Sequence, residues 1–371
     1  MQEFTVKLKA LTPIWTGDVD GKCNDLKESG IIGSLRWWYE ALLRGLGFNV
    51  CDPTNESSRC KLEQKKFYEA INSGKSVLEA LNEQNICPAC QLFGCSGWAR
   101  KFRLEINGEV KKIPEVNIGT RENRNNKSLI RKVAGLISNE NITLKFRELK
   151  EFTKEEYFLL NKTLEIIANY GALGSRISQG NGVIKITKNE LSVNNFTGEF
   201  SKYNTLLESK RSNKTNNNNL PNIKNFHFYK FVIEFEEKIT NLIDKKAFWT
   251  GDTNDNWKIL WKNHNILPIA FHTRDAIRRL EDNGEKRHDI FGELGKGSKI
   301  FVSHGYKNDN NDDKNVEVRI WGYNAKEQLE KIKNNLNSSL SEKLFIKGHE
   351  ITITCTPTVC KKGSELLEEL I

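Results

Sequence analysis

The strongest constraint on the fold is that one order of secondary-structure patterns occurs twice along the 371 residues. Alternating apolar residues predict strands, and apolar residues three or four apart predict helices. In the first half these patterns predict strand, helix, strand, strand, helix and strand at residues 4–10, 34–46, 102–106, 142–146, 153–167 and 183–187. In the second half the same order is predicted at residues 231–235, 273–281, 299–303, 316–321, 324–340 and 351–355.

The order strand–helix–strand–strand–helix–strand is that of the ferredoxin-like split βαβ unit, which is also the fold of RNA-recognition motifs. A shared motif supports a duplication, because F-G-x-x-G precedes the second predicted strand of each half, at 93–97 and 291–295. The sequence therefore predicts an α+β fold of tandem ferredoxin-like domains, each βαββαβ, with loop insertions.

A polar segment separates the two predicted units. Residues 196–225 are rich in asparagine, with four in succession at 216–219 followed by Pro221. Such a composition cannot bury enough apolar surface to offset the entropy of ordering. We therefore expect a linker or mobile loop at 196–225, between an N-terminal domain over residues 1–195 and a C-terminal domain over residues 226–371.

The charge of the chain favours an anionic partner. Lysine and arginine total 57 against 48 acidic residues, a net charge of +9, and the sequence pI is about 9.0. A surplus of this size is typical of proteins that bind nucleic acid. The mean hydropathy is −0.58, and the sequence contains neither an apolar run long enough to span a membrane nor the pattern of a signal peptide. We therefore expect a cytoplasmic protein with no membrane contact.

A glycine-rich run follows the second predicted helix of the first half, over residues 171–182. Glycines allow the backbone to approach a phosphate closely, and an arginine can add a forked charge to the same group. The predicted RNA contacts in this run are Gly174, Ser175, Arg176 and Gly180. The alternative is a helix C-cap followed by a tight turn, which needs only one or two of the glycines.

The first predicted helix carries aromatic residues beside arginines. Trp37 could stack on bases while Arg36 and Arg44 hold phosphates. In the alternative, this is a core helix in which both arginines pair with Glu40, four residues away from each. In the second half, Arg278 is expected on the outward face of its helix and is a further predicted RNA contact.

A long basic segment lies between two predicted strands of the first half, at residues 111–132. A loop of this length within a compact unit is usually functional or disordered. The predicted RNA contacts in it are Arg121, Arg124, Lys127 and Arg131. A solvated basic loop without a ligand is the alternative.

Cysteines are concentrated in the first half, where a C-x₂-C pair occurs at Cys87 and Cys90. Cys51 and Cys60 could complete four thiolates around zinc, with Cys95 as an alternative fourth ligand. The other interpretation is that these are small buried residues of the core. A disulfide framework is not expected in a cytoplasmic protein.

All six histidines lie in the second half. A ribonuclease would need one as a general base, and the candidates are His288, beside Asp289, and His272. The sequence has no visible spacing of nucleophile, base and orienting group. Surface or hydrogen-bonded histidines are therefore the favoured interpretation.

Taken together, these motifs resemble the RAMP superfamily of CRISPR-associated proteins. The glycine-rich loop of that family is similar to residues 171–182, and its leucine-phenylalanine-glycine element is similar to residues 90–94. The combination of segments 12–17, 33–44 and 87–103 is most similar to the family of the first subunit of the Cmr complex, the type III-B RNA-targeting effector.

The resemblance implies two ferredoxin-like domains in a subunit at the head of the assembly, near the 3′ region of the guide. Its implied partners are sibling RAMP subunits, CRISPR RNA and the complementary single-stranded target RNA. In such complexes an acidic residue in a loop of the backbone subunit cleaves the target, but residues 117–122 offer only Glu122 and no aspartate. We therefore expect a non-catalytic subunit. The resemblance also implies that the basic segment is a thumb, which wedges the guide–target duplex through Arg121 and Arg124.

Two other functions stay open at this stage. One is a free-standing RAMP endoribonuclease that processes CRISPR RNA precursors with a histidine as general base. The other is a zinc-stabilised adaptor that binds only neighbouring proteins. RNA cleavage by the purified chain would indicate the first, and a lack of RNA binding by the isolated chain would favour the second.

Overall fold

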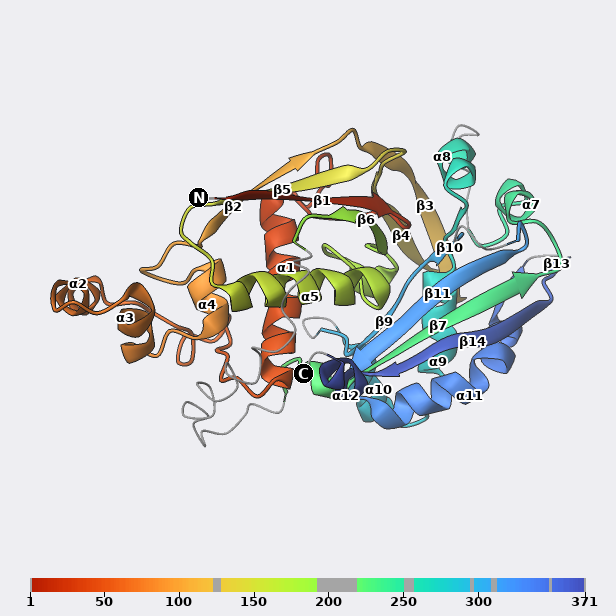
Figure 1. The fold of residues 1–371 in the computed structure, drawn as a ribbon. Helices are drawn as coiled ribbons and strands as arrows, with labels where there is room; N and C mark the ends of the chain where they lie inside the picture. The colour runs from red at the N-terminus through yellow and green to blue at the C-terminus, as the bar shows by residue number, and fades with distance from the viewer. Residues whose placement is uncertain are drawn as a thin grey trace.

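The computed structural model describes residues 2–122, 128–191, 219–249, 257–293, 297–307, 312–346 and 349–369 (Figure 1). Arg124, Lys127 and most of the predicted linker lie outside these residues, as does the side chain of Arg121. In the part of the chain that is described, no helix is long and apolar enough to cross a membrane.

The first half contains a four-stranded antiparallel sheet with the order β2-β5-β1-β6. Its strands are β1 (Glu3–Ala10), β2 (Phe102–Asn107), β5 (Ile142–Glu148) and β6 (Ile184–Asn189). Every second residue of β1 is buried, and helices α1 (Glu28–Gly45) and α5 (Lys154–Asn169) pack beside each other in this half. Numbered within the predicted βαββαβ unit, the strand order is second, third, first and fourth, which is the ferredoxin-like arrangement.

Two insertions interrupt this unit. Helices α2 (Gln64–Asn72), α3 (Val77–Glu83) and α4 (Pro88–Phe93) lie between α1 and β2, and α2 and α3 project from the body of the protein (Figure 1). Strands β3 (Lys111–Glu122) and β4 (Ser128–Ile137) form a hairpin between β2 and β5.

The hairpin corrects the predicted loop at 111–132. Ile113, Val116, Ile118 and Val133 are fully or almost fully buried, so one face of the hairpin packs against the protein. The charged residues dominate the composition of this segment and conceal the apolar alternation that predicts strands. Among the hairpin residues whose side chains are described, the basic ones, Lys111, Lys112, Arg131 and Lys132, are all exposed.

The second half repeats the fold of the first. Its sheet has the order β14-β7-β11-β10-β8, and β9 also pairs with β11. The repeated unit consists of β7 (Phe226–Phe235), α9 (Ala270–Arg278), β9 (Ile300–Val302), β11 (Asn315–Tyr323), α11 (Lys326–Lys343) and β14 (Ile353–Lys362). The strand order is again the ferredoxin-like one, with β14, β7, β11 and β9 as neighbours. The predicted α+β fold of tandem ferredoxin-like units is confirmed.

Shorter elements complete the second half and its junction with the first. They are α7 (Ile239–Asp244), α8 (Trp257–Asn263), β8 (Ile266–Leu267), α10 (Gly284–Phe291), β10 (Gly305–Tyr306), β12 (Phe345–Ile346), β13 (His349–Glu350), α12 (Gly363–Glu368) and the 3-10 turns η1 (Ile177–Gln179) and η2 (Ile223–Asn225). Turn η2 belongs to the predicted linker, yet Ile223 is completely buried. The end of that segment therefore packs into the protein.

The two halves share buried contacts. Arg319 of β11 is only 4% exposed and donates to the carbonyls of Ile167, Ala168 and Gly171 at the C-terminal end of α5. A cation at this end of a helix also interacts favourably with the helix dipole. The indole of Trp261 donates to the carbonyl of Pro114 in the hairpin. These contacts hold the second sheet against the first half.

Candidate functional site

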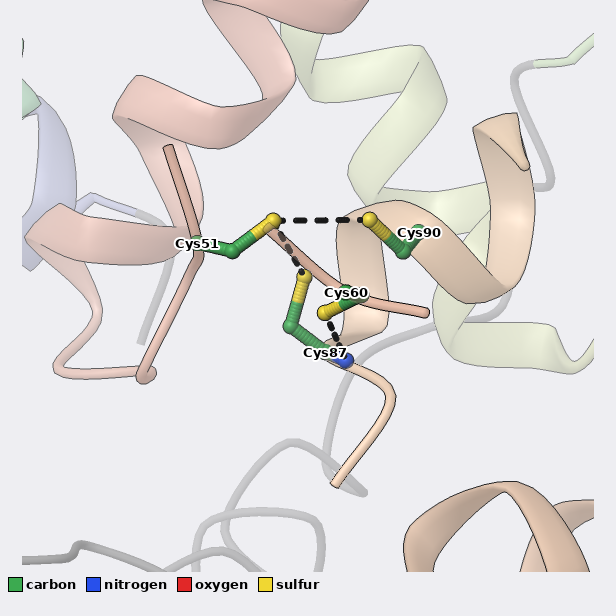
Figure 2. A group of neighbouring side chains, drawn as sticks. All are labelled: Cys51, Cys60, Cys87 and Cys90. Carbon is green, nitrogen blue, oxygen red and sulfur yellow. Dashed lines mark hydrogen bonds between the residues drawn. The ribbon is translucent and has the colours of Figure 1, made fainter. Parts of the chain in front are cut away.

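Four cysteines meet at one point of the first half, and we call them the cysteine site. They are Cys51, Cys60, Cys87 and Cys90, and their sulfur atoms all lie within 4.8 Å of one another (Figure 2). Cys51 follows α1, Cys87 is the N-cap of α4 and Cys90 lies within α4. The sulfur of Cys51 lies 3.5 Å from that of Cys90 and 3.8 Å from that of Cys87.

These distances fit a tetrahedral metal ion. A zinc–sulfur distance of about 2.3 Å places the sulfurs of a tetrahedron about 3.8 Å apart. The backbone N–H of Cys87 donates to the sulfur of Cys60 at 3.3 Å, a contact that stabilises a thiolate. The four cysteines could therefore hold a metal ion. Cys95 contacts Cys90 but is not one of the four converging ligands.

The sulfurs also influence one another electrostatically. Hydrogen bonds from Cys60, Cys87 and Cys90 lower the pKa of the Cys51 thiol. The same interaction with Cys51 raises the pKa of Cys90. Four thiolates at these distances repel one another, so a divalent cation is needed for all four to coexist.

Arg36 lies beside the cysteine site. Its Nη2 donates to the sulfur of Cys90 at 3.2 Å, its Nη1 to the carbonyl of Gly94 at 2.9 Å and its Nε to Glu40 at 2.7 Å. Burial lowers the pKa of Arg36, but the hydrogen bond with Glu40 and the charge of Cys90 outweigh burial and raise it. All three nitrogens have partners inside the protein, so the structure does not place Arg36 at an RNA-contacting surface.

Arg44 also donates its hydrogen bonds to groups within the protein. Its Nη2 donates to Glu40 at 3.3 Å and to the carbonyl of Cys51 at 3.0 Å, and its Nη1 donates to the carbonyl of Pro221 at 3.1 Å. Burial raises the pKa of Glu40, while the two arginines oppose this effect. The structure therefore supports the alternative that both arginines pair with Glu40.

Trp37 does not form a base-stacking surface either. Its ring makes edge contacts with Phe226, Phe301 and Tyr323 of the second half. It packs at the junction of the halves, because the helix face opposite the first core faces the second sheet. Arg278 of α9 is half-buried and has an interaction partner within the protein, so its predicted outward position is only partly realised.

The glycine-rich run directs its amides into the protein. The N–H groups of Gly174, Ser175 and Gly182 donate to Ser34 Oγ and to the carbonyls of Trp15 and Pro13. A Cβ at Gly174, where φ is +95°, would lie 2.6 Å from the Trp15 carbonyl. The N–H of Gly180 donates to the carbonyl of Ile177. These glycines permit a tightly packed turn, so their N–H groups are not available to cradle a phosphate.

Arg176 differs from the rest of the run. Its guanidinium lies 3.4 Å from the centroid of the Trp15 ring, and it donates no hydrogen bond to any residue that the structure describes. Its backbone is left-handed, with φ of +54°. The guanidinium is therefore held by stacking while its N–H groups remain available.

Arg176 lines a cavity of about 390 Å³, which we call the basic pocket. The pocket lies between the glycine-rich run, the β3–β4 hairpin and Phe271 of α9. Its charged lining residues are Lys22, Lys112, Glu115, Arg131, Lys132 and Arg176. With five cations against one carboxylate, the lining is strongly positive, which favours an anionic ligand.

Of the predicted contacts, the structure brings Arg131 and Arg176 together in the basic pocket. It is also lined by four residues that were not among the predicted contacts: Trp15, Lys22, Lys112 and Lys132. Trp15 stands within the family-like segment 12–17, which is the one signal that could have identified it. Lys132 is paired with Glu115 at 2.8 Å, whereas Lys112 and Arg131 are exposed.

The candidate histidines do not form a catalytic group with their predicted partners. His288 is paired with Glu293 at 3.1 Å, and Asp289 pairs with Lys299 instead. His272 contacts the carbonyl of Phe248, and burial lowers its pKa. No histidine lines the basic pocket in the part of the chain that the structure describes.

Comparisons with known proteins point to one superfamily. Residues 7–185 match the family model described as RAMP superfamily. A curated relative, "CRISPR system Cmr subunit Cmr1-2" of Pyrococcus furiosus, is 25% identical over 187 residues, which are 50% of this chain and 96% of the relative. These two matches confirm the resemblance found in the sequence.

Two solved structures are also similar. The crystal structure of Cmr1 from Pyrococcus furiosus matches with a TM-score of 0.36 and 12% identity, over 87% of this chain and 88% of that chain. A chain in the cryo-EM structure of the type III-B Cmr-beta complex bound to cognate target RNA and AMPPnP matches with a TM-score of 0.40 and 11% identity, over 92% of this chain and 99% of that chain.

Proposed function

Since residues 7–185 match the RAMP superfamily model, we propose that this chain is a non-catalytic RNA-binding subunit of a type III-B CRISPR effector complex. Its partners are CRISPR RNA, the complementary target RNA and sibling RAMP subunits. The relative that matches half of the chain carries the name of a Cmr subunit, which supports this assignment. The place proposed for the subunit is near the 3′ region of the guide.

The observation that carries RNA binding is the open guanidinium of Arg176 above Trp15 in the basic pocket. Arginine can stack on an aromatic ring and still hold a phosphate through its N–H groups. Lys112 and Arg131 approach the same cavity from the hairpin. In RNA-guided recognition, base pairing reads the sequence, so the protein needs only backbone and shape contacts of this kind.

The absence of a catalytic role is part of the proposal. The charged residues of the basic pocket include one carboxylate, Glu115, which is paired with Lys132. One neutralised carboxylate does not make a two-metal site or an acid–base pair. Positively charged groups can hold a phosphate of RNA, but cleavage also needs a general base. The pocket residues therefore favour binding of RNA over its cleavage.

We further propose that the cysteine site holds zinc. Four cysteine sulfurs within 4.8 Å are the ligand set that zinc prefers in closed structural sites. When bound, the ion cross-links the segment after α1 to helix α4. The residues of the chain supply the thiolates, and Arg36 supplies a positive charge beside them.

The test of RNA binding is a titration of fluorescently labelled single-stranded RNA, repeated at several KCl concentrations. We expect Arg176→Ala and Arg131→Ala to weaken binding for all RNA sequences. The slope of log K against log salt should fall by about one for each lost phosphate contact. The matched control is Arg103→Ala, which removes an exposed arginine from the edge strand β2.

Each sample is also run on a denaturing gel. Intact RNA agrees with a non-catalytic subunit, and shortened RNA that disappears with His288→Ala would establish the ribonuclease instead. A loss of binding limited to particular RNA sequences would contradict backbone recognition. If both pocket variants bind RNA with unchanged affinity, the basic pocket is not part of the RNA interface.

A further inference from the structure

The cysteine site has a charged connection to the junction of the two halves. Arg36 contacts the sulfur of Cys90 and one oxygen of Glu40. The other oxygen of Glu40 accepts from Arg44, which also contacts the carbonyl of Pro221. Three side chains of α1 therefore connect a sulfur of the cysteine site to the segment that leads into β7.

This connection is buried. The side chains of Glu40 and Arg44 are 6% and 9% exposed, and that of Arg36 is 20% exposed. Screening by water is weak at such positions, so each charge depends on its neighbours. Removing one member leaves another without compensation inside the protein.

The positive charges of Arg36 and Arg44 require a second negative charge, at the sulfurs. Two guanidinium groups meet a single carboxylate, which leaves one positive charge facing the sulfurs. A divalent ion with four thiolates carries two negative charges, and uncharged thiols carry none. The Nη2–sulfur contact of 3.2 Å is therefore strongest when a metal holds the thiolates. Outer hydrogen-bond partners of this kind tune metal affinity in proteins.

The far end of the connection is also well packed. The amide of Asn222 donates to the carbonyl of Arg44 at 3.3 Å, and Ile223 is fully buried. A Cβ at Gly363 of α12 would collide with the carbonyl of Ile223. The segment 221–225 thus lies in a close fit between the end of α1 and the second half.

We propose that metal occupancy of the cysteine site is coupled to the docking of segment 221–225, and that Arg36 is the positioning residue which carries this coupling. The inference rests on the proposed metal site and is independent of RNA binding. By thermodynamic linkage, a docked segment raises metal affinity as much as bound metal stabilises the docked segment.

The experiment uses the full-length protein with Zn²⁺. Hydrogen exchange of peptides covering residues 219–235 is measured with zinc bound and after removal by a chelator. Zinc removal should speed exchange there in the unchanged protein. In Arg36→Gln the exchange should be fast with or without zinc, and zinc affinity should fall about 10- to 100-fold.

Two further measurements separate coupling from simple damage. The thiolate-to-metal absorption of the Co²⁺-loaded protein should shift in Arg36→Gln and be largely restored in Arg36→Lys, which retains the charge. Arg44→Gln should abolish the zinc dependence of exchange at 219–235 while reducing zinc affinity less than Arg36→Gln does. The matched control is Arg103→Gln, which should change none of these values.

The outcomes are distinguishable. If zinc binds normally but the rate of hydrogen exchange at 219–235 does not depend on zinc, the coupling is wrong and the metal site stands. A purified protein that neither contains nor binds zinc would overturn both the metal site and this inference. In both cases RNA binding through the basic pocket would be unaffected.

Discussion

The cysteine site and the basic pocket each contain an arginine, and the two arginines are used in opposite ways. Arg36 donates through all three types of nitrogen to groups inside the protein. Arg176 is held by stacking on Trp15, with no hydrogen bond to a described residue. An arginine whose donors are satisfied internally serves the fold, whereas one that is positioned with its donors open can bind a ligand.

The largest effect that would sharpen this comparison comes from removing a sulfur ligand. Cys87→Ser should abolish zinc binding and lower the free energy of unfolding by about 4 kcal/mol when free zinc is a thousandfold above its Kd. Urea unfolding with and without a chelator measures this difference. Cys360→Ser, at an exposed position of β14, is the control, and a loss of equal size there would argue against a metal site.

The next effect concerns the buried carboxylate. Glu40→Gln leaves Arg36 and Arg44 without their shared negative charge, and we expect the free energy of unfolding to fall by about 3 kcal/mol. The exposed Glu69 of α2 offers a matched Glu69→Gln control, expected within about 0.5 kcal/mol of the unchanged protein. If both variants had the same stability, the arginine–glutamate connection would contribute nothing to the fold.

Acidification should lower the stability of the protein through His304, which lies beside the glycine-rich run that lines the basic pocket. This residue is fully buried against Gly180, and burial lowers its pKa to about 3. The unfolded imidazole binds a proton below about pH 6.5 and the folded one only near pH 3, so stability falls as the pH decreases through this window. Between pH 7.5 and pH 5, proton binding by His304 in the unfolded chain lowers the free energy of unfolding by about 2 kcal/mol.

Urea unfolding of the unchanged protein and of His304→Gln at pH 7.5 and pH 5 tests this expectation. Acid also weakens metal binding by thiolates, but that effect is common to both proteins. The variant should therefore lose about 2 kcal/mol less on acidification. An equal loss in both would mean that His304 is not the group that responds to acid.

The smallest effect on stability is expected at the basic pocket itself. Arg176→Ala removes one partly exposed cation–π contact, so the free energy of unfolding should change by about 1 kcal/mol or less. RNA affinity should nevertheless decrease. If this variant lost much stability, Arg176 would be a structural residue like Arg36 and not a ligand-binding one.

Much of the fold could be predicted because its causes are local. The alternation of Val6 and Leu8 and the spacing of Leu160 and Leu164 are properties of short segments, and such patterns predict a strand and a helix without knowledge of distant residues. The two ferredoxin-like units followed from the order of such segments. The hairpin at 111–137 was missed because its apolar residues alternate among many charges.

Less of the candidate site could be predicted. The four cysteines were identified because few chemical roles need four sulfurs in one region. Among the predicted RNA contacts that the structure describes, the sequence could not separate Arg36 and Arg44 from Arg131 and Arg176. The separation depends on partners such as Glu40, Gly94 and Trp15, and two of these contacts join residues more than 50 positions apart along the chain.

By itself, the sequence determined the order of elements, the duplication, the basic charge and the supply of thiols, since each follows from residue types and their spacing. The tertiary structure alone decided which arginines are buried, where the hairpin packs and that segment 221–225 docks beside α1. The physical reason is that hydrogen bonding and burial depend on neighbours in space. Two arginines with the same intrinsic chemistry acquire different roles once the fold supplies or withholds their partners.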